Sequence, residues 1–219
     1  MKRFLLLSTF CLAFLIHGQA QTISQINFDA IKTAVASSKS AYYYPSLLKR
    51  YHANDVSLTS EDYKHLYYGW VFQPGYNPYK GNDKADALNQ MLLYERFPEI
   101  ITTGKKILQT DPFNLDVMYL MVMAYGEMRN KAESDKWLAK VEGIAGAIKA
   151  SGTGQSPESA VVLVAPRDEY MFLTMVGLRQ ASAPQLVENK YHLIPVKSPN
   201  KLNYTQVYFN IQKPLARKK

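Results

Sequence analysis

Between residues 83 and 149 the chain repeats one pattern: an amphipathic segment, a break of a few residues, and another amphipathic segment. Apolar side chains recur at helical spacing within each segment, and Pro98 suits the first turn of the second one. The sequence therefore predicts helices over 83–94, 98–110, 115–128 and 131–149. Connections this short force neighbouring helices to run antiparallel, which is the strongest constraint on the fold.

The part of the chain before this block also carries helical signals. An apolar stripe covers 23–35, and a short turn of helix is expected over 46–51. Thr59 followed three residues later by Asp62 resembles a capping box, and the residues behind it have helical apolar spacing. Two prolines and a glycine within 73–78 predict a loop there.

The amino-acid composition changes after Gly154. A helix is expected over 168–178 with Asp168 as its cap, and strands are expected over 160–164, 191–196 and 204–211. This order predicts an α+β fold: N-terminal antiparallel helix pairs, then a small antiparallel sheet with one covering helix. The Gly, Ser and Pro residues of 151–157 separate a helical-repeat-like domain (21–150) from a small α+β module with a basic C-terminal tail (151–219).

The first 20 residues have the layout of a secretory signal peptide. Lys2 and Arg3 precede an apolar run over 4–16, and the segment ends in small residues up to Ala20. A retained membrane anchor needs roughly 20 apolar residues, and a lipid anchor needs a cysteine after a small-residue box, whereas Cys11 lies inside the apolar run. We expect cleavage after Ala20 and an exported chain, periplasmic or extracellular, without a transmembrane segment. A retained anchor and a lipoprotein are the alternatives.

Composition excludes several function classes. Cys11 is the only cysteine, so the mature chain would lack disulfides, thiol catalysis and cysteine metal sites. The formal net charge is +8, and basic residues gather toward the C-terminus: Lys197, Lys201, Lys213, Arg217, Lys218 and Lys219. This tail fits either a solvated end or a patch for an anionic surface. No nucleic-acid-binding motif accompanies it, so nucleic acid is not an expected partner.

Few residues offer catalytic or cofactor chemistry. Outside the leader the histidines are His52, His65 and His192; no pair has the spacing of a helical metal site, although His52 and His65 lie in neighbouring helical segments. A Gly-x-Ser-x-Gly hydrolase motif is absent. The glycines of 152–154 precede a strand and lack the Lys-Ser/Thr of a nucleotide loop, so they are interpreted as a linker. No cofactor, metal or catalytic residue is predicted.

Tyrosines are the strongest functional signal. Nine of the 16 tyrosines lie between Tyr42 and Tyr79, and adjacent ones point in different directions, so one buried face cannot take them all. One interpretation is packing with the hydroxyls at the surface. The other is a concavity that binds a peptide or glycan, because tyrosine is enriched where proteins meet ligands. Its candidate residues are Tyr43, Tyr67, Trp70, Tyr76 and Tyr79.

The segment KKILQTDPFN and the helix after it resemble a tetratricopeptide repeat. They place an apolar residue at Leu108, a terminal proline at Pro112 and an aromatic at Tyr125. Gly104 and Ile107 depart from the usual aromatic and alanine, and a second proline-terminated copy does not follow. Degenerate repeat pairs and an unrelated antiparallel bundle both stay open.

A wider resemblance covers nearly the whole mature chain. The leader, the tyrosine-rich first helices and the segments GTGQSPESAVVLV, DEYMFLTMVGL and YTQVYFNI together resemble a bacterial family of secreted proteins with a domain of unknown function, number 4919. The resemblance implies bacterial origin and export. It supplies no catalytic residues.

The sequence favours a secreted, non-catalytic binding or scaffold protein of the bacterial envelope, with a protein or glycan partner. One alternative is a hydrolase of an envelope polymer whose carboxylates the sequence does not identify. The acidic pairs Glu61-Asp62 and Asp168-Glu169 fit helix starts, where they stabilise N-terminal amide groups without catalysis. A purely structural accessory protein is the other alternative.

Signal-peptide cleavage gives a first prediction. N-terminal sequencing of the protein recovered from its native host is expected to begin at Gln21, because the small residues that end at Ala20 match the preference of signal peptidase. Recovery of an intact Met1 contradicts cleavage.

Overall fold

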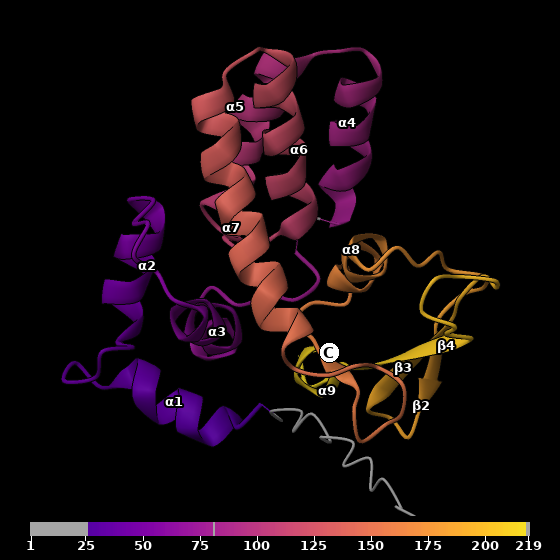
Figure 1. Cartoon of the computed structure of the whole chain (residues 1–219). Coiled ribbons are helices and arrows are strands. Elements are labelled where there is room, and N and C mark those ends of the chain that lie inside the picture. The colour runs from indigo at the N-terminus through magenta and orange to yellow at the C-terminus, as the bar shows by residue number, and fades with distance from the viewer. Residues whose placement is uncertain (1–25, 81, 218–219) are drawn as a thin grey trace, which may run out of the picture.

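The computed structural model describes residues 26–80 and 82–217 (Figure 1). Helices make up its N-terminal part and a small sheet forms near the C-terminus, so the chain is α+β, as predicted. The leader over 1–20 lies outside the described residues. In the described ranges, no helix combines the length and the apolar character needed to cross a membrane.

The four predicted ranges between 83 and 149 are helices, with bounds that agree to within two residues. The helices are α4 (Asn82–Leu93), α5 (Phe97–Leu108), α6 (Leu115–Glu127) and α7 (Lys131–Lys149). Asn114 and Asn130 cap α6 and α7, and each side-chain oxygen accepts a backbone N–H at 3.2 Å. The four helices lie side by side, and α6 packs against both α5 and α7 (Figure 1).

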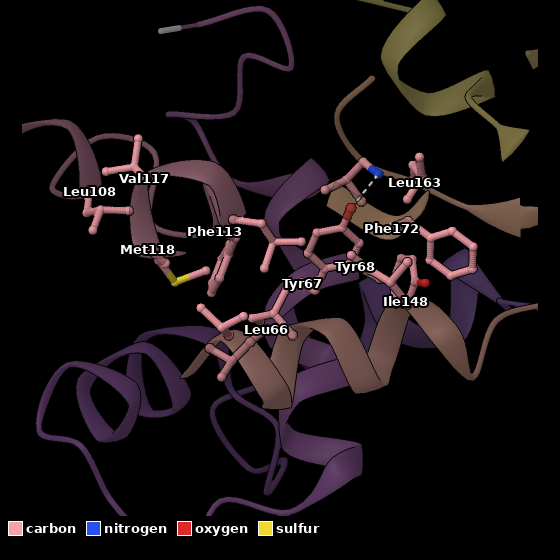
Figure 2. Close-up of a cluster of buried hydrophobic side chains, with 14 of the residues drawn as sticks. Leu66, Tyr67, Tyr68, Leu108, Phe113, Val117, Met118, Ile148, Leu163 and Phe172 are labelled. Atoms are coloured by element: carbon pink, nitrogen blue, oxygen red, sulfur yellow. Dashed lines mark hydrogen bonds between the residues drawn. The ribbon is translucent and has the colours of Figure 1, made fainter. Parts of the chain in front are cut away.

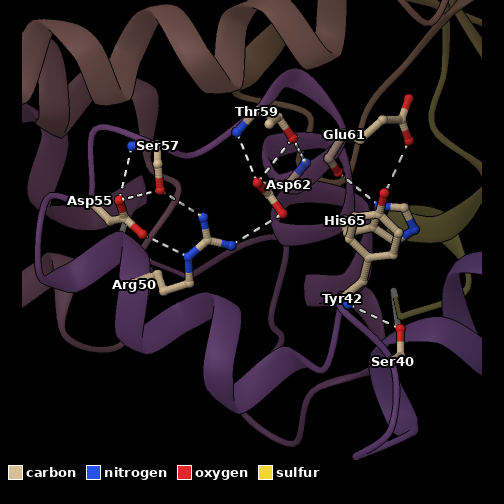
Figure 3. A network of polar contacts seen from close by, with 9 residues as sticks. All are labelled: Ser40, Tyr42, Arg50, Asp55, Ser57, Thr59, Glu61, Asp62 and His65. Carbon is tan, nitrogen blue, oxygen red and sulfur yellow. Dashed lines mark hydrogen bonds and ion pairs between the residues drawn. The ribbon is translucent and has the colours of Figure 1, made fainter.

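The helices before this block are shorter: α1 (Phe28–Ala36), α2 (Tyr44–His52) and α3 (Ser60–Gly69), followed by the 3-10 turn η1 (Trp70–Phe72). The predicted capping box is confirmed, because Thr59 Oγ1 accepts from Asp62 N at 3.2 Å and Asp62 Oδ2 accepts from Thr59 N at 2.8 Å (Figure 3). Arg50 of α2 donates to Asp55 at 2.7 Å and to Asp62 at 3.4 Å, which ties α2 to the start of α3.

The sheet is mixed, not antiparallel as the sequence predicts. In the described residues it has strand order β1-β4-β3-β2, and its strands are β1 (Val161–Val162), β2 (Gln185–Val187), β3 (Tyr191–Pro195) and β4 (Gln206–Asn210). The prediction fails at β1, which pairs parallel with β4 through Val161 and Phe209. A parallel partner needs a long crossover, and here α8 and two strands intervene between β1 and β4.

The helix expected over 168–178 is α8 (Asp168–Met175), and a short α9 (Gln212–Leu215) follows the sheet. Alternation in β4 buries Val207 and Phe209. Phe172 of α8 meets Phe209 edge-to-face at 5.5 Å between ring centroids, so α8 covers the sheet as predicted. The expected cap is wrong, because Asp168 is the first residue of α8 and its side chain points elsewhere.

One hydrophobic cluster runs from the helices into the sheet (Figure 2). Tyr68 of α3 is fully buried, and its hydroxyl donates to the carbonyl of Val162 at 3.1 Å. Ile148 of α7 and Phe172 of α8 belong to the same cluster. The helical region and the sheet therefore share their core.

The glycines of 152–154 pack into this junction. Gly154 has φ +74, donates its N–H to Ser159 O at 2.7 Å and accepts from Tyr208 N at 2.8 Å. A Cβ on Gly152 would lie 2.5 Å from the carbonyl oxygens of Ser159 and Ala160. The interpreted linker is thus held by backbone contacts on both sides, and only glycine fits at 152.

Adding one methyl group at either of two glycines tests this close approach. Gly152→Ala is expected to lower the free energy of unfolding by roughly 1–3 kcal/mol, because backbone oxygens cannot move aside as a side chain can. Gly146→Ala is the matched control: nothing lies within 4 Å of its added Cβ in α7, so helix propensity should raise stability by about 0.5–1 kcal/mol. Urea unfolding followed by circular dichroism measures both. Equal effects contradict the packing at Gly152.

Candidate functional site

A groove of about 660 Å³ lies between α4, α6 and α8. Leu88 and Leu92 of α4 contribute apolar surface, and Tyr119 of α6 and Tyr170 of α8 line the same groove. These two tyrosines are 45% and 48% exposed. We call this feature the α4–α6–α8 groove. It combines apolar surface, two accessible aromatic rings and several polar side chains.

An imidazole–carboxylate pair forms part of the groove wall. His192 Nδ1 of β3 lies 2.7 Å from Glu169 Oε1 of α8, and Glu169 is only 1% exposed. Burial raises the pKa of Glu169, while the hydrogen bond and charge of His192 act in the opposite direction. The pair can therefore hold a proton beside the groove, as acid–base groups do.

Asp116 supplies a second carboxylate to the same groove. It is partly buried near the start of α6, and burial raises its pKa, with the charge of Arg167 opposing that rise. Asp116 can thus accept hydrogen bonds from a ligand that enters the groove, whereas Glu169 is 1% exposed and bonds to His192.

Arg167 lines the groove and connects the segments that form its walls. Its guanidinium lies 2.8 Å from Asp111 Oδ2 and donates to the carbonyl of Lys80 at 2.8 Å. Asp111 also accepts from the amide of Asn114, the α6 cap, at 2.9 Å. These bonds connect the residue before α8 to the residues that begin α6. The spacing of the groove walls therefore depends on an ion pair with little solvent access.

The deepest polar contact joins Tyr67 of α3 to Asp168 of α8. The Tyr67 hydroxyl donates to Asp168 Oδ2 at 2.6 Å. It also accepts from Val164 N at 3.2 Å, the bond drawn as a dashed line in Figure 2. Burial raises the pKa of Asp168 to about 7, and the nearby Asp116 and Asp111 carboxylates add to the rise. Asp168 is therefore a carboxyl group whose proton is retained up to near-neutral pH.

Two buried polar atoms beside this contact lack a hydrogen-bond partner among the described residues: Arg167 Nε and Asp168 Oδ1. Both residues line a cavity of about 10 Å³ together with Trp70 and Tyr76. That volume is about one water molecule. A single water bonded to both atoms would satisfy them, so this small cavity is part of the core and not a ligand site.

The five sequence-predicted aromatics fall into two groups. Tyr67 is 0% exposed and Tyr76 is 7% exposed, and the Tyr76 hydroxyl donates to Val164 O at 2.7 Å. Trp70, Tyr43 and Tyr79 are partly exposed, and Trp70 packs edge-on against Phe113. The structure brings Tyr67, Trp70 and Tyr76 together beside Asp168 and Arg167. Tyr67 has no surface to offer a ligand, so binding by this set stays a prediction for its exposed members.

His65 and His52, which lie in neighbouring helical segments, each pack against a tyrosine ring. His65 stacks on Tyr42 with ring centroids 3.8 Å apart, and its Nδ1 lies 2.8 Å from Glu61 O (Figure 3). His52 packs edge-to-face on Tyr51. Across the ranges that the structure describes, no three His, Cys, Asp or Glu side chains gather as a metal site would require.

The sequence does not identify the polar residues of the groove as one site. Asp116, Glu169 and His192 are far apart in the chain, and no spacing rule joins them. The pair Asp168-Glu169 is noticed in the sequence and interpreted as helix-start carboxylates that stabilise N-terminal amide groups. Both residues do lie in the first turn of α8. The sequence does not show that each is only 1% exposed and bonds to a tertiary partner.

The Asp168 carboxyl makes stability depend on pH. Its pKa is about 7 in the folded protein against 3.8 as a free group, so the folded state binds this proton more tightly. Its contribution to stability is full below pH about 4 and is lost as pH rises to about 7. Asp168→Asn, which keeps an acceptor for Tyr67, is expected to flatten the fall in unfolding free energy over that range.

Urea unfolding at a series of pH values measures the effect. Asp29→Asn, an exposed carboxylate of α1, is the matched control and should leave the wild-type profile unchanged over the same range. A variant at Asp168 with the full wild-type pH dependence contradicts the assignment.

Comparison with known proteins places the chain in one family. The profile of the family described as Domain of unknown function (DUF4919) matches residues 29–219. No curated protein matches the sequence, and no solved structure matches the fold. The family match includes both the helices and the sheet, together with every residue of the α4–α6–α8 groove. The chain therefore belongs to the DUF4919 family.

Proposed function

We propose that this protein is an exported, non-catalytic binding protein of the bacterial envelope, and that it binds a glycan in the α4–α6–α8 groove. The observation that carries the proposal is the placement of two exposed rings, Tyr119 and Tyr170, on one groove that also holds carboxylates.

The chemistry of the groove suits a hydroxyl-rich chain. Aromatic faces accept the apolar faces of sugar rings, while the partly exposed Asp116 accepts hydrogen bonds from sugar hydroxyls. A volume of about 660 Å³ lies within the ordinary range for ligand sites and holds a few sugar units. The Arg167–Asp111 ion pair keeps the groove walls in place before a ligand arrives.

Export is supported by the leader. Lys2 and Arg3, the apolar run and the small residues up to Ala20 form a signal peptide, and the only cysteine is lost with it. The mature protein would be periplasmic or extracellular. The helix pairs of α4 to α7 act as a tetratricopeptide-like scaffold, which presents one side of α6 to the ligand.

The alternative is a hydrolase that cleaves the same polymer. The specific observation in its favour is the Glu169–His192 pair, with a carboxyl group whose pKa is raised by burial. Such a group could protonate a leaving oxygen, with Asp116 as its partner carboxylate. Binding is preferred because the buried Glu169 already uses one oxygen on His192.

Substitution of the two rings tests the binding proposal. Tyr119→Ala with Tyr170→Ala is expected to weaken binding of soluble envelope oligosaccharides about tenfold or more, because stacking area is lost from both walls. Tyr94→Ala is the matched control, since Tyr94 is 73% exposed and does not line the groove. Calorimetric titration of the mature protein measures the affinities, and equal values for the double variant and the wild type contradict the proposal.

The same oligosaccharides separate binding from hydrolysis. A binding protein produces no new reducing ends on prolonged incubation. Release of reducing ends by the wild type, abolished in Glu169→Gln, identifies the hydrolase instead.

A further inference from the structure

A second cavity, of about 750 Å³, lies on another side of the helical region. One wall is formed by Leu58 and Tyr63 around the start of α3, and the facing wall is α7 with small residues at Ala139, Gly143 and Ala147. The Tyr63 ring lies directly over Gly143, because a Cβ at Gly143 would meet it at 2.3 Å. We call this the α3–α7 cavity. Its walls are chiefly apolar.

Lys140 of α7 also lines this cavity and is only 7% exposed. Its Nζ lies 4.6 Å from the ring centroid of Tyr51 and 4.8 Å from that of Trp137. The ion pairs formed among the described residues do not include Lys140. Aromatic faces stabilise an ammonium group but do not replace an oxygen acceptor for its three N–H donors.

Lys140 is a largely buried cation that forms no direct ion pair among the described residues. Burial lowers its pKa to about 8, so the group still carries its charge at pH 7 for most of the time. Burial and, second, the charge of Lys140 lower the pKa of the neighbouring His52. The charge of Glu133 acts on Lys140 in the opposite direction to burial, but Glu133 forms its ion pair with Lys136.

The other charges of the cavity have partners of their own. Asp55 pairs with Arg50 (Figure 3), with 2.7 Å between Oδ2 and Nε. Glu61 pairs with Lys64 at 3.3 Å. Asp135 pairs with Lys131 at 2.6 Å. Glu142 is exposed to water at the rim. Lys140 is therefore the deep charge that an entering anion would meet.

We infer that the α3–α7 cavity binds a small amphipathic monocarboxylate, with its carboxylate on Lys140 and its hydrocarbon chain along Tyr63 and the small residues of α7. One buried cation matches one carboxylate, whereas a phosphate dianion needs more donors. The apolar walls match an aliphatic chain, and the volume suits a fatty acid of medium length. This site is separate from the α4–α6–α8 groove and does not depend on the glycan proposal.

Decanoate is the probe for this site, added to the mature protein at pH 7. Wild type is expected to bind it with a change in the fluorescence of Trp137, whose ring lies beside the ammonium of Lys140. Lys140→Met keeps the length of the side chain and removes the charge, so affinity should fall about tenfold or more. Lys149→Met, at an exposed lysine of α7 that does not line the cavity, should bind decanoate as the wild type does.

A second variant tests the position independently of charge. Gly146 is exposed and lines the cavity with nothing within 4 Å of an added Cβ, so the side chain of Gly146→Leu begins in open space and should weaken decanoate binding while the fold is retained. Decanol, which lacks the carboxylate, should bind at least tenfold more weakly than decanoate. The inference is overturned if wild type does not bind decanoate, if Lys140→Met binds it equally well, or if decanol binds as tightly.

Discussion

The hydrogen bond from Tyr67 to Asp168 holds the two parts of this protein together. It links α3 to the first residue of α8, and the same hydroxyl accepts from Val164, just after β1. Tyr68 and Tyr76 donate to the carbonyls of Val162 and Val164 at 3.1 and 2.7 Å. Backbone groups buried between layers must find partners, and here tyrosines from the helical part provide them. Helices and sheet can therefore pack without a layer of water between them.

This contact also positions the α4–α6–α8 groove. Because Asp168 faces the core, its neighbours Glu169 and Tyr170 point in other directions around α8. Glu169 then reaches His192, and Tyr170 lines the groove beside Asp116. The same packing buries several carboxyl groups. Because burial disfavours the charged form, it raises the pKa values of Asp168, Glu169, Asp111 and Asp116. The packing that holds the fold together therefore also raises the pKa values of the groove carboxyls Glu169 and Asp116.

The helical half was predictable because its signals are local. Apolar spacing and the caps at Asn114, Asn130 and Thr59 act over one or two turns, and α4 to α7 begin and end close to the predicted residues. The sheet was predictable only in part. β3 and β4 are apolar enough to recognise, but β2 is short and mostly exposed, and the parallel pairing of β1 with β4 is a long-range choice.

The candidate sites show the same division. The sequence singled out the tyrosines as its strongest functional signal, but Tyr67 and Tyr76 are core residues whose hydroxyls bond to the interior. Lys140 gave no sequence signal at all, since its character comes from Tyr51, far away in α2, as well as from Trp137 in its own helix.

By itself, the sequence determined the helices, their antiparallel order, the α+β class and the features of an export leader. These follow from contacts between residues a few positions apart. Only the tertiary structure decided the order of the strands in the sheet and which tyrosines are buried. It also decided that Asp116, Glu169 and His192 lie at one groove. The physical reason is that burial and charge pairing depend on which distant segments of the chain come into contact. The spacing of nearby residues does not specify those contacts.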